Sequence, residues 1–389
     1  MDGSSMRWQL VNFLTIALSI YAAINAYIFI HGWQGVPSSA GWRIAYTAVF
    51  VFLFLSFIAG RLVEREWFSD FSEVLVWTGS FWVGAMLYFF LICVLIDILR
   101  IANYLLPFFP NALTANPSRA ATATLVVAVS AVALLLAGGH VNSRIIRVRT
   151  VDIEIPKKVS GSKTLNIAMA ADIHLGTIIG KSRVESIVAK LNSLNPDLII
   201  LDGDVVDEDL GPILMADIGN TLRGLHAPLG VIAVTGNHEY IGGIDLAAKY
   251  LTDHNIRLLR DEVLKIRDDI YIVGREDRSR SSFNGGPRKP LAELMAQVDT
   301  TKPVILLDHQ PRGLDEGASM GADLELCGHT HRGQIWPWSL ATKAVYDVNY
   351  GYARVGAMQA YVTSGAGTWG PPARIGTSPE IVRIVVHFL

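Results

Sequence analysis

Charged residues are scarce in this sequence. Asp, Glu, Lys and Arg make up 17% of its 389 residues, whereas soluble domains contain about 25%. The deficit is uneven along the chain, and its distribution marks a boundary between two regions. The formal net charge is only −2. Bulk charge therefore gives no reason to expect a nucleic-acid partner.

Cysteine is almost absent as well. Cys93 lies in an apolar run, and Cys327 ends an apolar stretch that is typical of a strand. We do not expect the two to pair, which excludes a fold held together by disulfides. Cys327 adjoins candidate metal ligands, but we interpret it as strand packing, because free cysteine is among the most buried residues.

The first region is rich in long apolar runs. A helix that spans a membrane needs about 20 apolar residues. The first run is too long for the apolar core of a secretory signal, and further runs follow it, so we do not expect cleavage. We predict an integral, multi-pass membrane region over residues 1–140, with the lipid bilayer as its partner. The four expected spans are Trp8–Ile30, Ile44–Gly60, Val74–Ile98 and Ala121–Gly138.

The polar residues near these runs bear on orientation and function. Asp97 and Arg100 end the third run and are expected at the interface. We recognise no carboxylate or histidine cluster inside the spans, so no ion path is expected. Four spans place both flanking regions on one side, and the arginine excess predicts that this side, with the second region, is cytoplasmic. The arginines on that side are Arg7, Arg61, Arg65, Arg144, Arg147 and Arg149.

Short polar patches follow apolar stretches in the second region, residues 141–389. The alternation of expected strands and helices favours an α/β fold with a largely parallel sheet. Sites in such folds form beyond the carboxyl ends of strands, so the patches should converge in space. The expected strands before the patches are Leu165–Ala170, Leu198–Leu201, Val231–Thr235, Val304–Leu307 and Leu324–Cys327.

The patches offer more nitrogen and oxygen ligands than one tetrahedral zinc ion needs. They suit two ions roughly 3.5–4 Å apart that share a carboxylate. A mixture of imidazole, amide and carboxylate favours manganese first, with iron, zinc or nickel as alternatives. The candidate metal ligands are Asp172, His174, Asp204, Asn237, His309, His329 and His331.

The order of the patches is Asp-x-His, Gly-Asp-x-x-Asp, Gly-Asn-His-Glu, His and Gly-His-x-His. This order closely resembles the calcineurin-like metallophosphoesterase family, in particular its membrane-linked bacterial-type members. The resemblance covers residues 166–389. It implies an α/β two-sheet sandwich flanked by helices, here following an N-terminal four-helix transmembrane region. One departure is Arg332, which stands where glycine is frequent and puts the shape of that loop in question.

The resemblance also implies roles for the ligands. It assigns one ion to Asp172, His174 and His331 and the other to Asn237, His309 and His329, with Asp204 bridging both. A metal-bridging hydroxide would then attack the phosphorus atom.

Further residues around these ligands receive roles as well. By the same resemblance His238 contacts the phosphate and protonates the leaving oxygen. We interpret Asp207 and Glu239 as residues that orient the ligands. Arg374 has two open interpretations, a clamp for the substrate phosphate or an ordinary ion pair.

The function predicted from these observations is a membrane-anchored dimetal phosphoesterase. Its substrate would carry a phosphodiester or diphosphate bond, in a lipid-linked molecule such as a nucleotide-activated glycolipid. Two alternatives stay open at this point. One is a phosphoesterase with a soluble substrate, in which the membrane region is only an anchor. The other is a metal-binding sensor without turnover.

Overall fold

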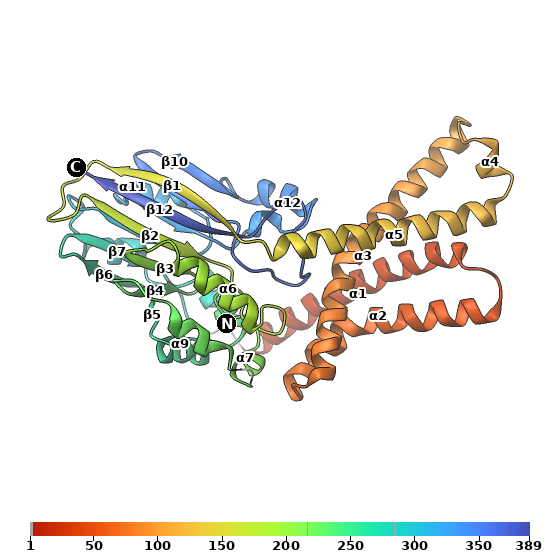
Figure 1. The fold of residues 1–389 in the computed structure, drawn as a ribbon, viewed down its shortest axis with the longest axis horizontal. Coiled ribbons are helices and arrows are strands. Elements are labelled where there is room, and N and C mark those ends of the chain that lie inside the picture. Colours follow the sequence, from red (N-terminus) through yellow and green to blue (C-terminus); the bar gives the residue numbers. More distant parts are fainter. Residues whose placement is uncertain (1–2, 216, 284) are drawn as a thin grey trace. The chain divides into compact units, whose positions relative to one another are not determined.

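The computed structural model describes residues 3–215, 217–283 and 285–389 (Figure 1). The chain forms two compact units. The first comprises residues 1–63 and 70–138, and the second comprises residues 64–69 and 139–389. The division after residue 138 lies close to the boundary expected at residue 140.

The first unit consists of long helices. Within the described residues, four of them are long and apolar enough to cross a membrane. Large apolar side chains cover their outer surfaces, as at Leu134, which is 75% exposed. These features indicate membrane association. The helices are α1 (Gly3–Gly35), α2 (Ala40–Glu66), α3 (Asp70–Leu105) and α5 (Pro117–Ser143), with the short α4 (Asn111–Thr114) between the last two.

The structure corrects one expectation about these helices. We expected no cluster of histidine and carboxylate within the spans, yet His31 of α1 lies 3.0 Å from Asp97 of α3. The hydroxyl group of Tyr27 donates to the same carboxylate at 2.6 Å. His31 and Asp97 are 66 residues apart and meet only because α1 and α3 pack together.

The second unit contains two six-stranded sheets, as the expected two-sheet sandwich requires. The first sheet has the order β1-β12-β2-β3-β4-β5, and Figure 1 shows β12 lying between β1 and β2. Its strands are β1 (Arg147–Ile155), β2 (Thr164–Ala170), β3 (Leu198–Asp202), β4 (Val231–Val234), β5 (Arg257–Leu259) and β12 (Glu380–Phe388). The second sheet has the order β10-β11-β9-β8-β7-β6. Its strands are β6 (Glu262–Ile266), β7 (Ile270–Gly274), β8 (Val304–Leu307), β9 (Leu324–Cys327), β10 (Gly351–Val355) and β11 (Met358–Val362).

Both sheets are mixed, and most pairings between the described strands are parallel, as expected. The central strands β2, β3 and β4 run parallel, and so do β7, β8 and β9. Antiparallel neighbours stand outside them, because β12 pairs with β2, β6 with β7, and β10 with β11. The parallel centre of each sheet brings consecutive strand ends to one edge, which is where the polar patches begin.

Helices and short 3₁₀ turns connect the strands. The connection between β3 and β4 contains α7 and η1 rather than one continuous helix, and Asp217 before η1 has φ 48°, which a right-handed helix does not accommodate. The connecting elements are α6 (Lys181–Asn192), α7 (Gly211–Met215), η1 (Ile218–Gly224), α8 (Asn237–Ile241), α9 (Ile244–Asp253), η2 (Arg278–Phe283), α10 (Leu291–Met295), α11 (Leu314–Ser319), η3 (His331–Gly333) and α12 (Trp338–Val345).

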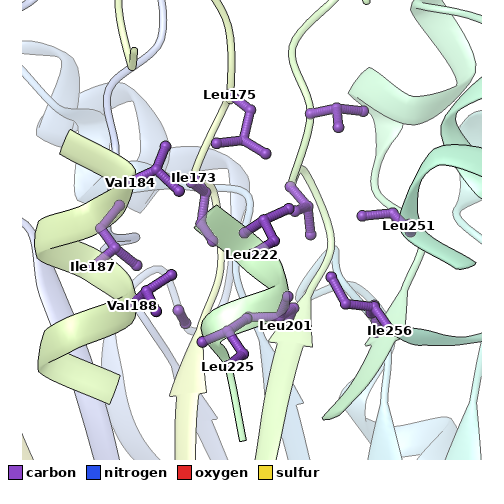
Figure 2. Close-up of a cluster of buried hydrophobic side chains, with 14 of the residues drawn as sticks. Ile173, Leu175, Val184, Ile187, Val188, Leu201, Leu222, Leu225, Leu251 and Ile256 are labelled. Atoms are coloured by element: carbon purple, nitrogen blue, oxygen red, sulfur yellow. The ribbon is translucent and has the colours of Figure 1, made fainter. Parts of the chain in front are cut away.

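Two apolar layers fix the strands that precede the patches. Figure 2 shows the layer beneath α6, where Val184, Ile187 and Val188 pack on the first sheet. Alternate residues of β2 face opposite ways, so that Ala168 belongs to this layer and Ile167 to the layer between the two sheets. Because both faces of β2 are buried, its carboxyl end is held rigidly in place.

Candidate metal centre

Every predicted ligand residue lies within a few residues of the end of a strand. Asp172 follows β2, Asp204 follows β3, and Asn237 follows β4. In the second sheet His309 follows β8 and His329 follows β9. The structure brings all of the predicted ligand side chains together at this edge, although their role as ligands stays a prediction.

One group of ligand atoms comes from Asp172, His174 and His331. These three residues offer ligand atoms that all lie within 4.8 Å of one another, and all three residues are buried. The Nε2 atoms of His174 and His331 are 3.0 Å apart, and His331 Nε2 lies 3.6 Å from Asp172 Oδ1. This group has the residues that the resemblance assigned to one ion.

A second group forms around His309. The ligand atoms of Asp204, His309 and His329 also lie within 4.8 Å of one another. Asn237 joins them, since its Oδ1 atom is 2.9 Å from Nδ1 of His329. The carboxylate of Asp204 lies between the two groups, because its Oδ2 atom is 3.1 Å from His309 Nε2 and 4.0 Å from His174 Nε2.

The buried polar atoms fit a cation. His309 Nδ1 lies 2.7 Å from the carbonyl oxygen of Asp202, so Nδ1 donates there and Nε2 carries the lone pair in the neutral ring. That lone pair faces Asp204 Oδ2 at 3.1 Å. Two electron-rich atoms at this distance need a proton or a cation beside them. Among the described residues, His309 Nε2 and His174 Nδ1 are buried without a hydrogen-bond partner.

The protonation states of three of the ligand histidines also suit metal binding. Burial lowers the pKa of His174 to about 3 and the pKa of His329 to about 4. Burial also lowers the pKa of His331 well below its usual value, and the nearby guanidinium of Arg374 adds to that effect. A neutral imidazole is the form that coordinates a metal ion, so these rings are ready to act as ligands near neutral pH.

The ligand loops hold strained backbone conformations. Positive φ angles outside glycine cost free energy and gather at functional sites, where the surrounding structure enforces them. Most of the predicted ligands have such angles: Asp172 (φ 53°), His174 (φ 54°), Asp204 (φ 50°), His329 (φ 69°) and His331 (φ 47°).

Two glycines allow the loops to approach so closely. A Cβ atom on Gly203 would lie 2.5 Å from Nδ1 of His309, and one on Gly236 would lie 2.1 Å from Oδ1 of Asp204. Gly203 also has φ 78°. These contacts explain why glycine precedes Asp204 and Asn237 in their motifs.

Glu239 connects two of the ligand loops through hydrogen bonds. Its buried carboxylate accepts hydrogen bonds from the backbone N–H groups of Asp204, Val205 and Val206 at 3.0, 2.7 and 3.1 Å. It also accepts from Gly236 N–H at 2.7 Å. The side chain therefore orders the loop after β3 and the start of α8 together.

His238 and Asp207 form a pair beside the ligands. Asp207 Oδ1 lies 3.2 Å from Nδ1 of His238 and 3.8 Å from Nδ1 of His174. Burial opposes a charged His238 ring, but Asp204 and Asp207 outweigh it and raise the pKa of His238 to about 9. The exposed ring of Trp369 stands next to His238, with 5.6 Å between the ring centroids.

The side chain of Arg374 is buried next to the ligand residues and is not part of an open site. It is 1% exposed. Its guanidinium donates to the carbonyl oxygens of His331 and Gly367 at 2.9 and 2.6 Å and contacts His331 Nδ1 at 3.2 Å. The guanidinium therefore holds His331 and the loop around Gly367, and a contact between Arg374 and a substrate phosphate stays a prediction.

Arg332 shows why glycine is frequent at its position. It has φ 52° and ψ 27°, in the left-handed region that glycine adopts without cost. The arginine is accommodated here with its guanidinium 4.3 Å from the ring centroid of Tyr350. The loop therefore keeps its shape despite the substitution, and no ligand is displaced.

The fold and the pocket of histidine and aspartate define a metal-dependent phosphoesterase. The family described as "Calcineurin-like phosphoesterase" matches residues 165–333. The chain is 31% identical over 255 residues to an uncharacterized metallophosphoesterase of Aquifex aeolicus, covering 65% of this chain and 96% of that protein. This chain belongs to the calcineurin-like phosphoesterase family.

Two further relatives are longer than the Aquifex protein. An uncharacterized metallophosphoesterase of Helicobacter pylori is 37% identical over 230 residues, which cover 57% of this chain and 60% of that protein. A Danio rerio protein described as "Transmembrane protein with metallophosphoesterase domain" is 30% identical over 253 residues, covering 61% of this chain and 57% of that protein. The chain thus matches less than two thirds of the length of these two relatives.

Proposed function

We propose that this protein is a membrane-anchored dimetal enzyme that hydrolyses a phosphodiester or diphosphate bond. Asp172, His174 and His331 hold one ion in this proposal, and Asn237, His309 and His329 hold the other, with Asp204 between them. The observation that carries the proposal is the position of Asp204 Oδ2, which faces His309 Nε2 at 3.1 Å and His174 Nε2 at 4.0 Å. Manganese is the first candidate metal.

The bound ions would supply an activated water and neutralise the phosphoryl oxygens, which are the main needs of phosphoryl transfer. The protein's own groups do the rest. His238 protonates the leaving oxygen, and Asp207, 3.2 Å from its Nδ1 atom, orients the ring. Glu239 and Arg374 act by holding ligand loops, since each bonds to backbone groups of those loops.

We also propose that the substrate carries a lipid. Exposed tryptophans near the ligands in space or in sequence support this: Trp369 is 48% exposed beside His238, and Trp336 and Trp338, which follow the ligand His331 along the chain, are 52% and 54% exposed. Exposed apolar groups of this kind mark sites for apolar ligands or membranes. The arginine distribution supports a catalytic unit on the cytoplasmic side.

The metal mechanism is tested on the purified full chain with bis(p-nitrophenyl) phosphate. Activity should vanish after exhaustive chelation and return with manganese, iron, zinc or nickel, and the metal content should approach two ions per chain. Turnover that persists in a fully metal-free sample would disprove the mechanism.

The alternative of a soluble substrate is tested with Trp338→Ala and Trp369→Ala. Their kcat/KM should fall roughly tenfold on a nucleotide-activated glycolipid, because burial of each large aromatic face contributes about 1–3 kcal/mol. Their kcat/KM on the same headgroup without its acyl chains should stay near wild type. Tyr352→Ala, at an exposed aromatic residue of β10, is the matched control. Equal losses on both substrates would favour a soluble substrate.

A further inference from the structure

The helical unit contains an elongated, partly open apolar cavity. Its volume is about 520 Å³, and side chains of α1, α2, α3 and α5 line it. Ligand pockets commonly measure about 300–1,000 Å³. Along α3 the lining extends from Thr78 to Arg100, which is roughly 33 Å at the rise of an α-helix. The hydrocarbon core of a bilayer is about 30 Å thick and is shared by the acyl chains of two leaflets, so the cavity is long enough for one extended acyl chain.

The cavity is charged at one end only. His31 and Arg100 belong to its lining, and the rest of the described lining carries no Lys, Arg, Asp or Glu side chain. Arg100 lies 3.5 Å from the carboxylate of Asp97, which His31 Nε2 also contacts at 3.0 Å. Arg43 stacks on Trp33 at 4.7 Å near the same end.

The charge at this end of the cavity comes from two arginines and one carboxylate. His31 Nδ1 lies 3.0 Å from the carbonyl oxygen of Tyr27, and its Nε2 atom faces the Asp97 carboxylate. Arg100 lies 3.5 Å from the same carboxylate, and Arg43 stacks on Trp33 close by. Two guanidinium groups and one carboxylate leave an excess of positive charge.

We propose that this cavity binds one chain of an anionic phospholipid, whose phosphate rests against Arg100 and His31. The surplus cation favours an anionic headgroup, while a zwitterionic headgroup brings a positive charge of its own. The charged end lies near Gly35, to whose carbonyl Thr122 of α5 donates at 2.8 Å. Every residue that lines the cavity belongs to the helical unit. The inference is therefore independent of the proposed substrate and describes a separate lipid site.

The test measures lipid binding by native mass spectrometry of the full chain released from detergent. Dioleoyl phosphatidylglycerol should bind about fivefold more tightly than dioleoyl phosphatidylcholine, as expected for one net cation near the headgroup. Arg100→Gln should abolish this preference and leave phosphatidylcholine binding unchanged. Millimolar inorganic phosphate should leave bound phosphatidylglycerol in place. Displacement by phosphate would indicate a free-anion site and overturn the proposal.

A pair of variants on α5 tests the cavity itself. Ala128→Trp fills the lining and should weaken binding of both lipids at least about tenfold. Leu134→Trp, outside the lining and 75% exposed, should bind both lipids like wild type. Circular dichroism and size-exclusion chromatography in detergent show whether each variant keeps its helices. If Ala128→Trp does not fold, the lipid preference of Arg100→Gln is the deciding measurement. Equal binding of the two lipids by wild type, or equal binding by the two tryptophan variants, would overturn the proposal.

Discussion

The two units of this chain use polar groups in opposite ways. In the helical unit Asp97 is paired with His31 and Arg100, and the outer surface is apolar. In the catalytic unit buried carboxylates and imidazoles face one another closely, and some of their atoms have no hydrogen-bond partner. The first arrangement suits a lipid environment, and the second reserves its polar atoms for cations.

The same contrast applies to glycine. In the helices glycine allows close packing, since a Cβ atom on Gly79 would lie 2.4 Å from Cα of Phe57 in the neighbouring helix. In the catalytic unit Gly203 and Gly236 make room for ligand side chains instead. Substitutions of these glycines should therefore affect stability in the helical unit and metal binding in the catalytic unit.

The largest effect is expected for Asp204→Asn. It removes the charge shared by the two ligand groups, and kcat on bis(p-nitrophenyl) phosphate should fall roughly a thousandfold, since a metal ion supplies several kcal/mol at the transition state. Metal content, measured by mass spectrometry, should drop as well. Asp245→Asn, at an exposed position in the first turn of α9, is the control and should keep full activity. An Asp204→Asn variant with normal activity would remove the basis for a shared ligand.

A smaller effect is expected for Glu239→Gln. The amide cannot accept all the backbone hydrogen bonds that the carboxylate receives, so the free energy of unfolding should fall by about 2–3 kcal/mol. Thermal unfolding of the metal-loaded chain should shift down by roughly 5–10 °C. Glu262→Gln on β6 has an exposed side chain and should leave the melting temperature unchanged. Equal shifts for both variants would mean that the loop contacts contribute little.

Gly79→Val tests the packing of the helical unit. The added side chain meets the backbone of Phe57, and overpacking of this kind costs about 1–3 kcal/mol. Gly138→Val is matched, because a Cβ atom there has nothing within 4 Å. Tryptophan fluorescence during unfolding in detergent should show a lower free energy of unfolding for Gly79→Val and no change for Gly138→Val. Before unfolding begins, Gly79→Val should keep its metal-dependent turnover. A loss of metal binding in folded Gly79→Val would contradict the separation of roles.

The smallest effect is expected for Arg332→Gly. Relief of the left-handed backbone is offset by the lost contact with Tyr350 and by the flexibility of glycine, so stability should change by no more than about 1 kcal/mol. Arg332→Ala keeps the Cβ atom and loses the contact, so it should melt below Arg332→Gly. The reverse order would show that backbone strain at this position is negligible.

The candidate site was predictable because its residues follow strong local signals. Apolar runs indicate β2, β3, β4, β8 and β9, and the ligands stand directly after them. The direction of neighbouring strands was not predictable, because an apolar strand such as β12 has the same pattern whether its partner is parallel or antiparallel. The predicted largely parallel arrangement is confirmed, but the antiparallel pairings, such as that of β12 with β2, were not foreseen.

Contacts between residues that are far apart in the sequence could not be predicted from local sequence patterns. His31 is a single polar residue in an apolar run, and its partner Asp97 lies on another helix. Arg374 contacts His331 from 43 residues away, so its supporting role depends on tertiary structure. The helices also extend beyond the apolar runs that predict them, because the polar residues at their ends continue the helix.

The place of β12 has a consequence for biosynthesis. This strand, Glu380–Phe388, is inserted between β1 and β2, both of which emerge from the ribosome more than 200 residues earlier. The membrane helices are translated before any of the catalytic sheets, whereas the first sheet stays open until translation reaches β12. An exposed gap between two strands invites pairing with other chains. Nascent molecules should therefore pass through a vulnerable interval, already attached to the bilayer, in which a chaperone protects the unfinished sheet.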